Sequence, residues 1–288
     1  MATADMVMVH MGTVNRRMIN TQLTNSKIDR TAKPCPEIEP MIDLHLHILP
    51  GMDDGPVSWR KAIKMAVMAS GTGTTVAAAT VHGTLTGKAA RAYVLAYQRI
   101  LYKMQCQLKE RRLPLRLVSG MEILSDGDVI GRIRRGEALT LNQSPYVLIE
   151  FEFDVPALQI YRDLDRLLDA GYIPVLAHPE RYGCVRRSVD HIYEWHTMGT
   201  VIQVNKGSLL GDFGNDVFKT ADWILRHRLA SAVASDAHGL HMRTPDLDQL
   251  AQILEARYGV GCPRLLLWEN PERILAGRSV VDMESVRI

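Results

Sequence analysis

The 288-residue chain lacks the cysteine spacings typical of sulfur-based sites. It has four cysteines, far apart and without a Cys-x-x-Cys pair, so neither a disulfide framework nor a zinc–thiolate site is expected, and a reducing compartment fits. Cys106 and Arg112 have the Cys-x5-Arg spacing of cysteine-dependent phosphatases, but the residues between them contain no glycine and lie in a helical pattern. A phosphate-binding loop needs successive N–H groups turned inward, so we interpret Cys106 as structural.

Long apolar runs and a strong net charge are also missing. No stretch of 18 apolar residues occurs, and no apolar N-terminal segment precedes a cleavage site, so neither membrane insertion nor secretion is predicted. The formal net charge of +2 gives no overall attraction to nucleic acid or membrane. A Walker-type Gly-x4-Gly-Lys-Ser/Thr loop and a Gly-x-Ser-x-Gly elbow are absent from the sequence. These absences favour a cytoplasmic protein that does not bind nucleic acid.

Residues 1–40 differ from the rest of the chain. They are rich in Met, Thr and Asn, show no hydrophobic period and end in a proline-containing stretch. We interpret them as a mobile leader. Met41, which directly precedes the first predicted strand, is an alternative start of the native protein. Residues 41–288 are predicted to form a single domain.

From Met41 onward, strand-like and helix-like segments alternate, which predicts a parallel α/β architecture. Periodicity alone leaves open whether the sheet is a closed barrel or an open, doubly wound sheet. The helix at 156–170 shows an apolar stripe, and Ser58 and Gly71 are predicted to begin and end the first helix. The stripe consists of Leu158, Tyr161, Leu164, Leu167 and Leu168. Strands are predicted at 41–47, 74–80, 115–119, 146–150, 173–177, 201–204 and 231–234, and helices at 58–70, 89–112, 126–135, 156–170, 189–198, 216–228, 245–258 and 271–276.

The most informative motif is Asp43-Leu44-His45-Leu46-His47, followed by Asp53-Asp54-Gly55. Residues at i, i+2 and i+4 of a strand share one face, so this strand end would present a carboxylate and two imidazoles together. Such a set suits metal ligation. Taken alone, the motif favours a metal site only modestly over a polar edge strand with two solvent-facing histidines.

Further acids and histidines follow the other predicted strands. Each has an ordinary alternative as a loop, capping or surface residue, but functional groups of parallel α/β folds collect at the carboxyl ends of strands, and their joint appearance favours a metal site. Nine ligands exceed the need of a single ion and suggest two or three ions sharing bridging carboxylates. Such clusters of metal ions catalyse phosphoester hydrolysis. A ligand set that combines histidine and carboxylate side chains suits manganese, iron or zinc. The nine candidates are His45, His47, Asp54, His82, Glu122, Glu150, His178, Asp236 and His238.

Two arginines flank candidate ligands. Arg181 follows His178, and Arg243 lies five residues after His238. Guanidinium groups bind phosphate oxygens in a bidentate manner, so both are candidate catalytic residues, although surface positions are the alternative. If the site exists, Asp236 and His45 should lie within a few ångströms of each other.

The ordered motifs resemble the polymerase-and-histidinol-phosphatase (PHP) superfamily. More narrowly, they resemble the manganese-dependent bacterial tyrosine-protein phosphatases of capsule and exopolysaccharide loci, the CpsB/CapC type. The resemblance spans about Met41 to Ala276, and the order and spacing of its blocks make it specific. The blocks begin with Met41-Ile-Asp-Leu-His-Leu-His-Ile-Leu-Pro-Gly-Met-Asp-Asp-Gly-Pro56, and continue with Gly120-Met-Glu-Ile123, Leu148-Ile-Glu-Phe151, Val175-Leu-Ala-His-Pro-Glu-Arg-Tyr182, Gln203-Val-Asn-Lys-Gly-Ser-Leu-Leu-Gly211, Ala234-Ser-Asp-Ala-His238 and Glu269-Asn-Pro271.

The resemblance implies a distorted (β/α)7 barrel, similar to a TIM barrel, with a centre of up to three Mn2+ ions. It implies that one ion is held by His45, His47, Glu122 and Asp236, a second by Glu122, Glu150 and His178, and a third by Asp54, His82 and His238. It further implies that Arg181 and Arg243 grip the phosphate, and that a metal-bridging hydroxide attacks phosphorus without a phosphocysteine intermediate. Relatives often carry another polar residue after the position of His82, where this chain has Gly83, so contacts at the rim near the third ion differ.

The implied substrate is phosphotyrosine on a protein, specifically the tail of a tyrosine autokinase that controls polysaccharide assembly. One alternative is another phosphoesterase of the superfamily that acts on histidinol phosphate or a nucleotide. Another is a non-catalytic regulator that binds the kinase. The presence of all nine candidate ligands argues against the regulator.

Overall fold

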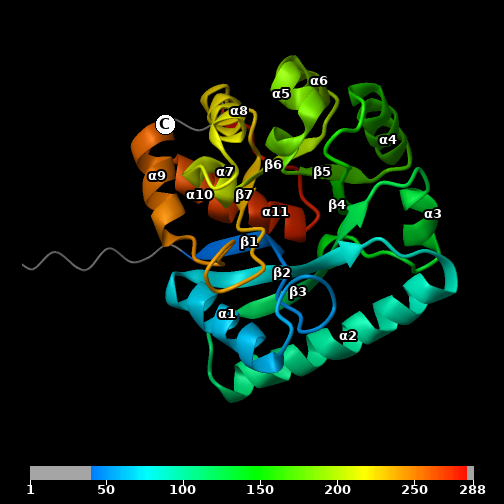
Figure 1. Cartoon of the computed structure of the whole chain (residues 1–288), viewed down its shortest axis with the longest axis vertical. Coiled ribbons are helices and arrows are strands. Elements are labelled where there is room, and N and C mark those ends of the chain that lie inside the picture. Colours follow the sequence, from blue (N-terminus) through cyan, green and yellow to red (C-terminus); the bar gives the residue numbers. More distant parts are fainter. Residues whose placement is uncertain (1–39, 284–288) are drawn as a thin grey trace, which may run out of the picture. The chain divides into compact units, whose positions relative to one another are not determined.

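In a computed structural model that describes residues 40–283, the seven predicted strands form one parallel sheet whose spatial order follows the sequence (Figure 1). Parallel neighbours in sequence order require a crossover between each pair of strands, and the helices supply it. The strands are β1 (Met41–Leu46), β2 (Thr74–Gly83), β3 (Arg116–Leu124), β4 (Tyr146–Glu150), β5 (Ile173–Ala177), β6 (Val201–Asn205) and β7 (Ala232–Ala234).

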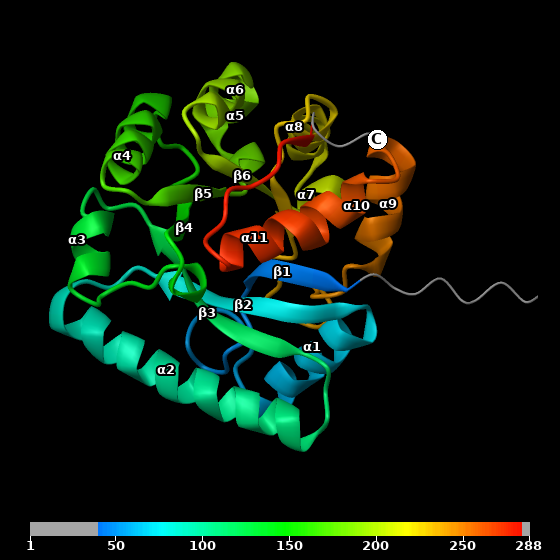
Figure 2. The same cartoon turned by 180° about the vertical axis from the view of Figure 1, so that it is seen from behind.

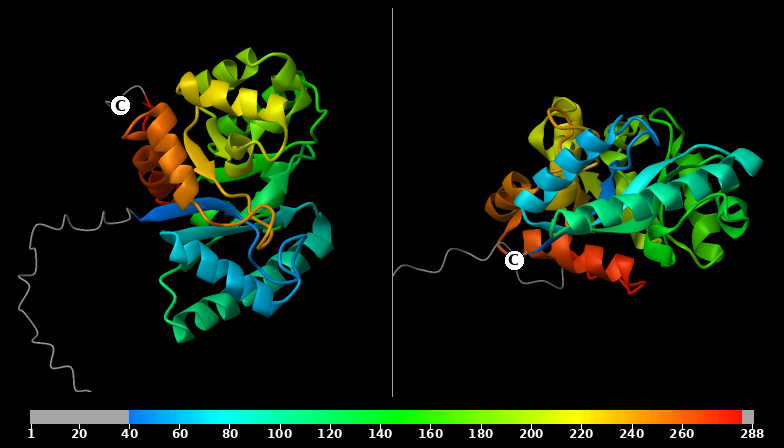
Figure 3. Two further views of the ribbon diagram at one scale, coloured as in Figure 1. Left: turned by 60° about the vertical axis from the view of Figure 1, so that its left-hand side comes forward. Right: turned by 90° about the horizontal axis from the view of Figure 1, so that it is seen from below.

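The sheet closes on itself between its first and last strands. Leu46 forms a parallel bridge with Ala237. The backbone N–H of His47 donates to the carbonyl of Ala237 (3.0 Å), and that of Asp236 donates to the carbonyl of His45 (2.8 Å). The architecture is therefore a barrel and not an open sheet, and its closure places the ends of β1 and β7 next to each other. The loops that follow these two strands lie side by side in Figure 3.

All eight predicted helices are present within a few residues of the expected bounds. Short helical turns were not predicted, because one or two turns carry too few residues to show a period. The predicted helices are α1 (Trp59–Gly71), α2 (Gly87–Glu110), α3 (Val129–Arg134), α4 (Ala157–Asp169), α6 (Asp190–Thr197), α8 (Asn215–Arg226), α9 (Asp248–Tyr258) and α11 (Asn270–Leu275). The additional turns are η1 (Leu141–Gln143), η2 (Pro179–Arg181), α5 (Gly183–Arg187), α7 (Lys206–Leu210), α10 (Cys262–Arg264) and η3 (Leu265–Glu269).

Two details of the predicted helices are wrong. Ser58 does cap α1, since its hydroxyl accepts from the N–H of Lys61, but Gly71 is the last helical residue, and the chain turns with positive φ at Gly73. In α4, Leu158 is exposed, and the buried stripe is formed by Ile160, Leu164 and Leu167. Leu164 and Leu167 are buried as predicted, whereas Tyr161 and Leu168 are only partly buried and Ile160 takes the place of Leu158.

The side chains that fill the barrel interior lie on the same face of each strand as side chains at its carboxyl end. A buried apolar cluster fills the interior and includes Ala78, Val118 and Leu148 from three strands. Because side chains alternate, the residues two and four positions further along face the same way. On β2 and β3 these positions lead to His82 and Glu122, and on β4 to Glu150. Both β2 and β3 are longer than predicted, so His82 and Glu122 lie within strands and not after them.

The opposite end of the interior is covered by α11. Ile274 and Leu275 of this helix belong to the interior cluster, and Figure 2 shows α11 beside β1. The apolar residues of α11 close this end of the interior, whereas the clustered His, Asp and Glu side chains lie at the carboxyl ends of the strands.

The predicted leader, residues 1–40, lies outside the described residues except for Pro40. Between residues 40 and 283, no helix combines the length and the apolar character needed to cross a bilayer.

Tyr97 offers a test of how α2 is fixed to the barrel. Its buried hydroxyl donates to the carbonyl of Ala79 on β2 (2.8 Å) and accepts from the N–H of Gly120 on β3 (2.9 Å). Tyr97→Phe leaves these groups with one partner fewer and should lower the free energy of unfolding by about 1–3 kcal/mol in urea denaturation. Tyr102→Phe, on the exposed face of α2, is the matched control and should change it by less than about 0.5 kcal/mol. Equal effects of the two variants would contradict this role.

Candidate metal centre

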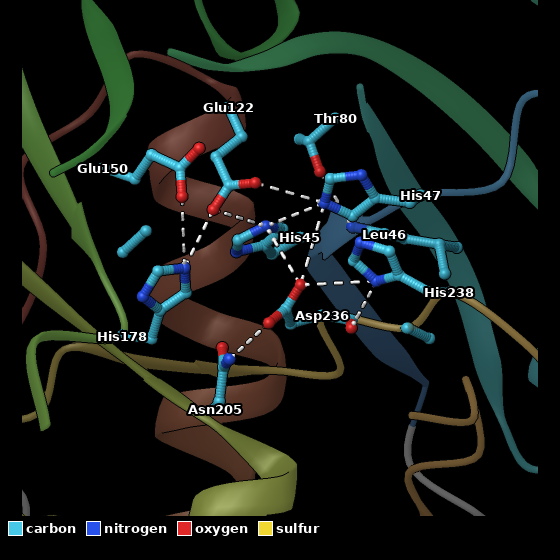
Figure 4. Close-up of polar contacts among 12 residues, drawn as sticks. His45, Leu46, His47, Thr80, Glu122, Glu150, His178, Asn205, Asp236 and His238 are labelled. Carbon is cyan, nitrogen blue, oxygen red and sulfur yellow. Dashed lines mark hydrogen bonds and ion pairs between the residues drawn. The ribbon is translucent and has the colours of Figure 1, made fainter. Parts of the chain in front are cut away.

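Glu122 is the centre of a buried cluster at the carboxyl end of the barrel (Figure 4). Its Oε1 lies 2.9 Å from His178 Nε2 and 3.2 Å from His45 Nε2. Its Oε2 lies 3.0 Å from His82 Nδ1 and 3.3 Å from His47 Nε2. One carboxylate from β3 is thus surrounded by four imidazoles, and it does not cap the following helix.

Asp236 occupies the other side of the two histidines of β1. Its Oδ1 lies 3.4 Å from His45 Nε2, which confirms the predicted approach of these two residues. The same oxygen accepts from the guanidinium of Arg243 (2.5 Å), while Oδ2 accepts from Asn205 Nδ2 (2.5 Å). Asp236 is 1% exposed, so its carboxylate is shielded from bulk water by the residues that it contacts.

The remaining candidates form the outer part of the cluster. Asp54 Oδ1 lies between His82 Nε2 (3.3 Å) and His238 Nε2 (3.1 Å), and the Asp54 side chain is 60% exposed. Glu150 Oε1 lies 3.2 Å from His82 Nδ1. All nine residues singled out in the sequence are therefore brought together, with Asp54 at the solvent edge and Glu122 at the deepest point.

The donor atoms fall into overlapping groups of the size that a metal ion needs. Within each group, one ligand atom from every residue lies within 4.8 Å of the others. His45, His47, His82 and Glu122 belong to two groups each, which suits ions that share bridging ligands. The groups are His47, Asp54, His82 and His238; His45, Glu122 and His178; His45, His47 and Asp236; and His82, Glu122 and Glu150.

At the outer edge of the cluster, two metal-ligating atoms face each other without a proton between them. His238 Nδ1 contacts the carbonyl of Asp236 (3.0 Å) and must carry its proton there, so Nε2 directs a lone pair at Asp54 Oδ1. Buried Nε2 of His238 and Oε2 of Glu122 have no hydrogen-bond partner. Lone pairs at such distances repel each other unless a cation or a proton lies between them. Both the donor chemistry and these unpartnered atoms fit divalent ions such as manganese, iron or zinc.

Residues behind the histidines fix their orientation. His45 Nδ1 lies 3.0 Å from Gln203 Oε1, and His47 Nδ1 lies 2.7 Å from Asp53 Oδ2. With Nδ1–H directed to these acceptors, the Nε2 atoms of both rings face the cluster, where they lie 3.2 Å apart. Acceptors behind the ligating ring are a regular feature of histidine metal sites.

The carboxylates of the cluster stabilise positive charge on neighbouring groups. Burial by itself lowers the pKa of His45 and His82, but neighbouring carboxylates outweigh burial and raise the pKa of His45 to about 9 and that of His82 to about 11. Burial would raise the pKa of Glu122, but the surrounding imidazoles hold it well below its usual range. His238 is the exception, since burial and the nearby charges of His47 and Arg243 lower its pKa to about 4. Protons and metal ions therefore compete for the same atoms.

Backbone strain accompanies the site. His178, Asp236 and Arg243 have φ of 37°, 48° and 48°, in the left-handed region that residues other than glycine rarely adopt. Such conformations persist where surrounding contacts over-determine them, and they concentrate at functional sites. Here they turn side chains at the ends of β5 and β7 into the cluster.

Both candidate arginines border the cluster. Arg181 lies 3.5 Å from Asp236 Oδ2, and its guanidinium is held between the rings of Phe153 (4.4 Å) and Phe213 (4.5 Å). Arg243 donates through its Nε to the carbonyl of Asp236 (3.1 Å). Their side chains are 19% and 28% exposed, so both guanidinium groups remain reachable from solvent.

A cleft of about 540 Å³ opens beside the cluster. Asp54, His82 and Glu150 form part of its wall, and the remainder is largely apolar or aromatic. Its volume is within the range of small-ligand sites. The further lining residues are Met52, Asp53, Thr84, Leu85, Tyr93, Leu124, Phe151, Glu152 and Phe153.

Sequence reasoning was wrong about Asp43 and did not identify the supporting residues. A register shift between Asp43 and Leu46 interrupts the alternation of β1. The Asp43 carboxylate turns to Ser235, whose hydroxyl lies at 2.5 Å and whose N–H donates at 3.1 Å, and so it joins β1 to β7. Asp53 and Gln203 stood in the quoted motifs, but only the folded structure shows which imidazole each contacts.

Comparison with known proteins agrees with the motif analysis. The family model described as "Capsular polysaccharide synthesis, CpsB/CapC" matches residues 41–276, the range of the predicted resemblance. Tyrosine-protein phosphatase YwqE of Bacillus subtilis (strain 168) is 35% identical over 246 residues, which cover 83% of this chain and 93% of that protein. Tyrosine-protein phosphatase CpsB of Streptococcus pneumoniae is 30% identical over 243 residues, which cover 82% and 98%.

A solved structure is similar as well. It comes from a study of YwqE from Bacillus subtilis and CpsB from Streptococcus pneumoniae, described there as unique metal-dependent tyrosine phosphatases. It matches 86% of this chain and 99% of its own, with a TM-score of 0.78 and 32% sequence identity. Sequence motifs, barrel and cluster geometry thus lead to one conclusion: the chain belongs to the CpsB/CapC family.

Proposed function

We propose that this chain is a metal-dependent protein-tyrosine phosphatase whose nine clustered His, Asp and Glu residues hold up to three Mn2+ ions. The observation that carries the proposal is the position of Glu122, a buried carboxylate with four imidazole nitrogens within 3.3 Å. Such a centre has no use in packing, because burying it costs desolvation of every charged member. The names of YwqE and CpsB support the same activity.

Ions held by these residues would supply Lewis acidity to a water molecule and to the phosphoryl group. The chain itself supplies their geometry. Glu122 bridges the inner donor groups, and Gln203 and Asp53 hold the imidazoles of His45 and His47 in the ligating orientation. Asp54, at the exposed edge, completes the outer group that faces the cleft.

Arg181 and Arg243 are assigned to the substrate phosphate. Each contacts Asp236, so both guanidinium groups lie at the edge of the cluster, where the non-bridging oxygens of a bound phosphate would accumulate charge. The two phenylalanine rings restrict Arg181 and reduce the entropy lost when it binds an anion. The apolar wall of the adjacent cleft suits the aromatic ring of phosphotyrosine.

The three cysteines between residues 40 and 283 do not suit a phosphocysteine mechanism. Cys106, Cys184 and Cys262 are free, and none of them belongs to the donor groups. Burial raises the pKa of the Cys184 thiol and raises that of Cys262 to about 12, which disfavours the nucleophilic thiolate at neutral pH. Cys106 lies on α2, beside Trp59 and Tyr102.

The finer part of the proposal concerns substrate and setting. We assign the substrate to the tyrosine-rich tail of a bacterial autokinase that controls polysaccharide assembly, and the site of action to the cytoplasm. The capsule-synthesis description of the family supports the link to polysaccharide assembly. Histidinol phosphate and nucleotides are the alternatives, since they carry the same phosphomonoester group.

His178→Ala should reduce the number of manganese ions per chain and nearly abolish turnover, because His178 Nε2 is the donor nearest to Glu122 Oε1. Metal content after equilibrium dialysis, measured by inductively coupled plasma mass spectrometry, tests this. His191→Ala, on α6 and outside the four donor groups, is the matched control and should keep wild-type content. Wild-type metal content in folded H178A protein would refute the ligand assignment.

Gln203→Leu should weaken manganese binding about 10–100-fold without removing a ligand, because the His45 ring loses the acceptor that orients it. Titration calorimetry measures the affinity. Gln98→Leu, at an exposed position of α2, is the control and should bind like wild type. An unchanged affinity of Q203L would show that His45 is oriented by other contacts.

Purified protein with added manganese should release phosphate from a phosphotyrosine peptide, and a chelator should stop the reaction. Treatment with a thiol-alkylating reagent should leave the rate unchanged, because no described cysteine belongs to the donor groups. Arg243→Ala should lower kcat/KM by about 10²-fold or more through the loss of phosphate contacts.

Small phosphomonoesters provide the comparison for this experiment. Faster turnover of histidinol phosphate or a nucleotide than of the peptide would indicate that the native substrate is a small phosphomonoester and not a phosphotyrosine protein. Manganese binding without hydrolysis of any of these substrates would reject the phosphatase proposal and favour a binding role.

A further inference from the structure

β6 is the strand that contributes no member of the nine-residue cluster, yet its end contacts the cluster repeatedly. Gln203 orients His45, and Gln203 Nε2 donates to Asn205 Oδ1 (2.8 Å). Asn205 Nδ2 in turn donates to Asp236 Oδ2 (2.5 Å). The residue after Asn205 is Lys206, the first residue of α7, and its side chain is only 4% exposed.

The buried ammonium of Lys206 is directed entirely at one short segment, Thr244–Asp246. It donates to the carbonyl and hydroxyl of Thr244, the latter at 3.0 Å. It also donates to the carbonyl and to Oδ1 of Asp246, both at 2.9 Å. An ammonium group has three N–H donors, so these four acceptors use all of them.

This segment directly follows Arg243. The carbonyl of Arg243 accepts from the N–H groups of His238 (2.9 Å) and Gly239 (3.3 Å), which closes a turn. At the tip of the turn His241 and Met242 are exposed, Met242 by 83%, and Leu240 is only partly buried against the core. Arg243 itself has a φ of +48°, a conformation that external contacts must hold. On the far side of Arg243, Lys206 supplies such contacts.

We propose that Lys206 is a positioning residue for Arg243: its buried ammonium fixes Thr244–Asp246 and thereby holds the Arg243 guanidinium where it meets a phosphoryl group. Asn205 and Lys206 are consecutive, so one short element fixes both Asp236 and the segment that presents Arg243. The inference rests on the proposed phosphatase function, in which Arg243 binds phosphate. Lys206 does not touch the substrate in this account.

The test compares K206M, R243A and the double variant as full-length, manganese-loaded proteins. Met keeps the apolar stem of the lysine and removes only the ammonium group. Calorimetric titration with inorganic phosphate gives the affinity, and metal content and kcat/KM on a phosphotyrosine peptide are measured alongside. Lys219→Met, at an exposed position of α8, is the matched control and should behave as wild type in each measurement.

K206M should weaken phosphate binding and lower kcat/KM, each by about tenfold, with manganese content unchanged. In the R243A background the same substitution should have almost no further effect, because Lys206 acts through the arginine. A loss of equal size in both backgrounds would overturn the proposal, and so would wild-type phosphate affinity in K206M. A fall in metal content would also overturn it, since Lys206 would then support the ligands and not Arg243.

Asp246→Asn replaces K206M as the test variant if K206M does not fold. It removes the ion pair between Lys206 and Asp246 and leaves the carbonyl acceptors of Thr244 and Asp246 in place. Its phosphate affinity should fall by a smaller factor, and amide hydrogen exchange of residues 239–247 should rise in the metal-free protein. Unchanged exchange and unchanged affinity in D246N would contradict the proposal. Failure of the phosphatase function itself would be distinct, because wild-type protein would then not hydrolyse the peptide.

Discussion

The structure depends on the enclosure of Glu122 by four imidazoles. A carboxylate with an exposed fraction near zero is costly to bury, and the nearby imidazoles of His45, His178 and His47 hold its pKa low. His45 and His47 are held in place by acceptors behind their rings, and His82 is held by its position in β2. The barrel therefore holds a group of mutually dependent charges that a bound cation would balance.

Most strands end in metal-ligating candidates, and one strand ends in residues that hold those candidates in place. β1 to β5 and β7 end in side chains of the cluster, whereas β6 ends in Gln203, Asn205 and Lys206, which hold residues of β1, β7 and the following loop. Closure between β1 and β7 through Asp43 and Ser235 brings the first and last strands of the sheet into one site. The contacts that close the barrel therefore lie directly beside the contacts that form the site.

Much of this arrangement could be predicted from the sequence, because it depends on where strands end. His82, Glu150 and His178 follow runs of apolar residues, and parallel strands must present such residues at one rim. The closed barrel could not be deduced from periodicity, since alternating segments satisfy an open sheet equally well. It was expected only through the resemblance to a known family.

Supporting contacts were beyond sequence reasoning for a different reason. Gln203, Asp53 and Lys206 act through partners that lie up to 158 positions away in the chain, and a buried amide or lysine has many possible partners before folding. Asp43 was misassigned because a shift of register in β1 overrides simple alternation. Short helical turns such as α5 and α7 were missed because they are too brief to show a period.

The most direct test of the account is anomalous X-ray diffraction from crystals grown with manganese, with data collected on both sides of the manganese absorption edge. The account predicts more than one anomalous peak among the nine donors, with Glu122 oxygens about 2.0–2.3 Å from two of them. A map without a peak in contact with Glu122, or with manganese bound only elsewhere on the protein, would contradict it.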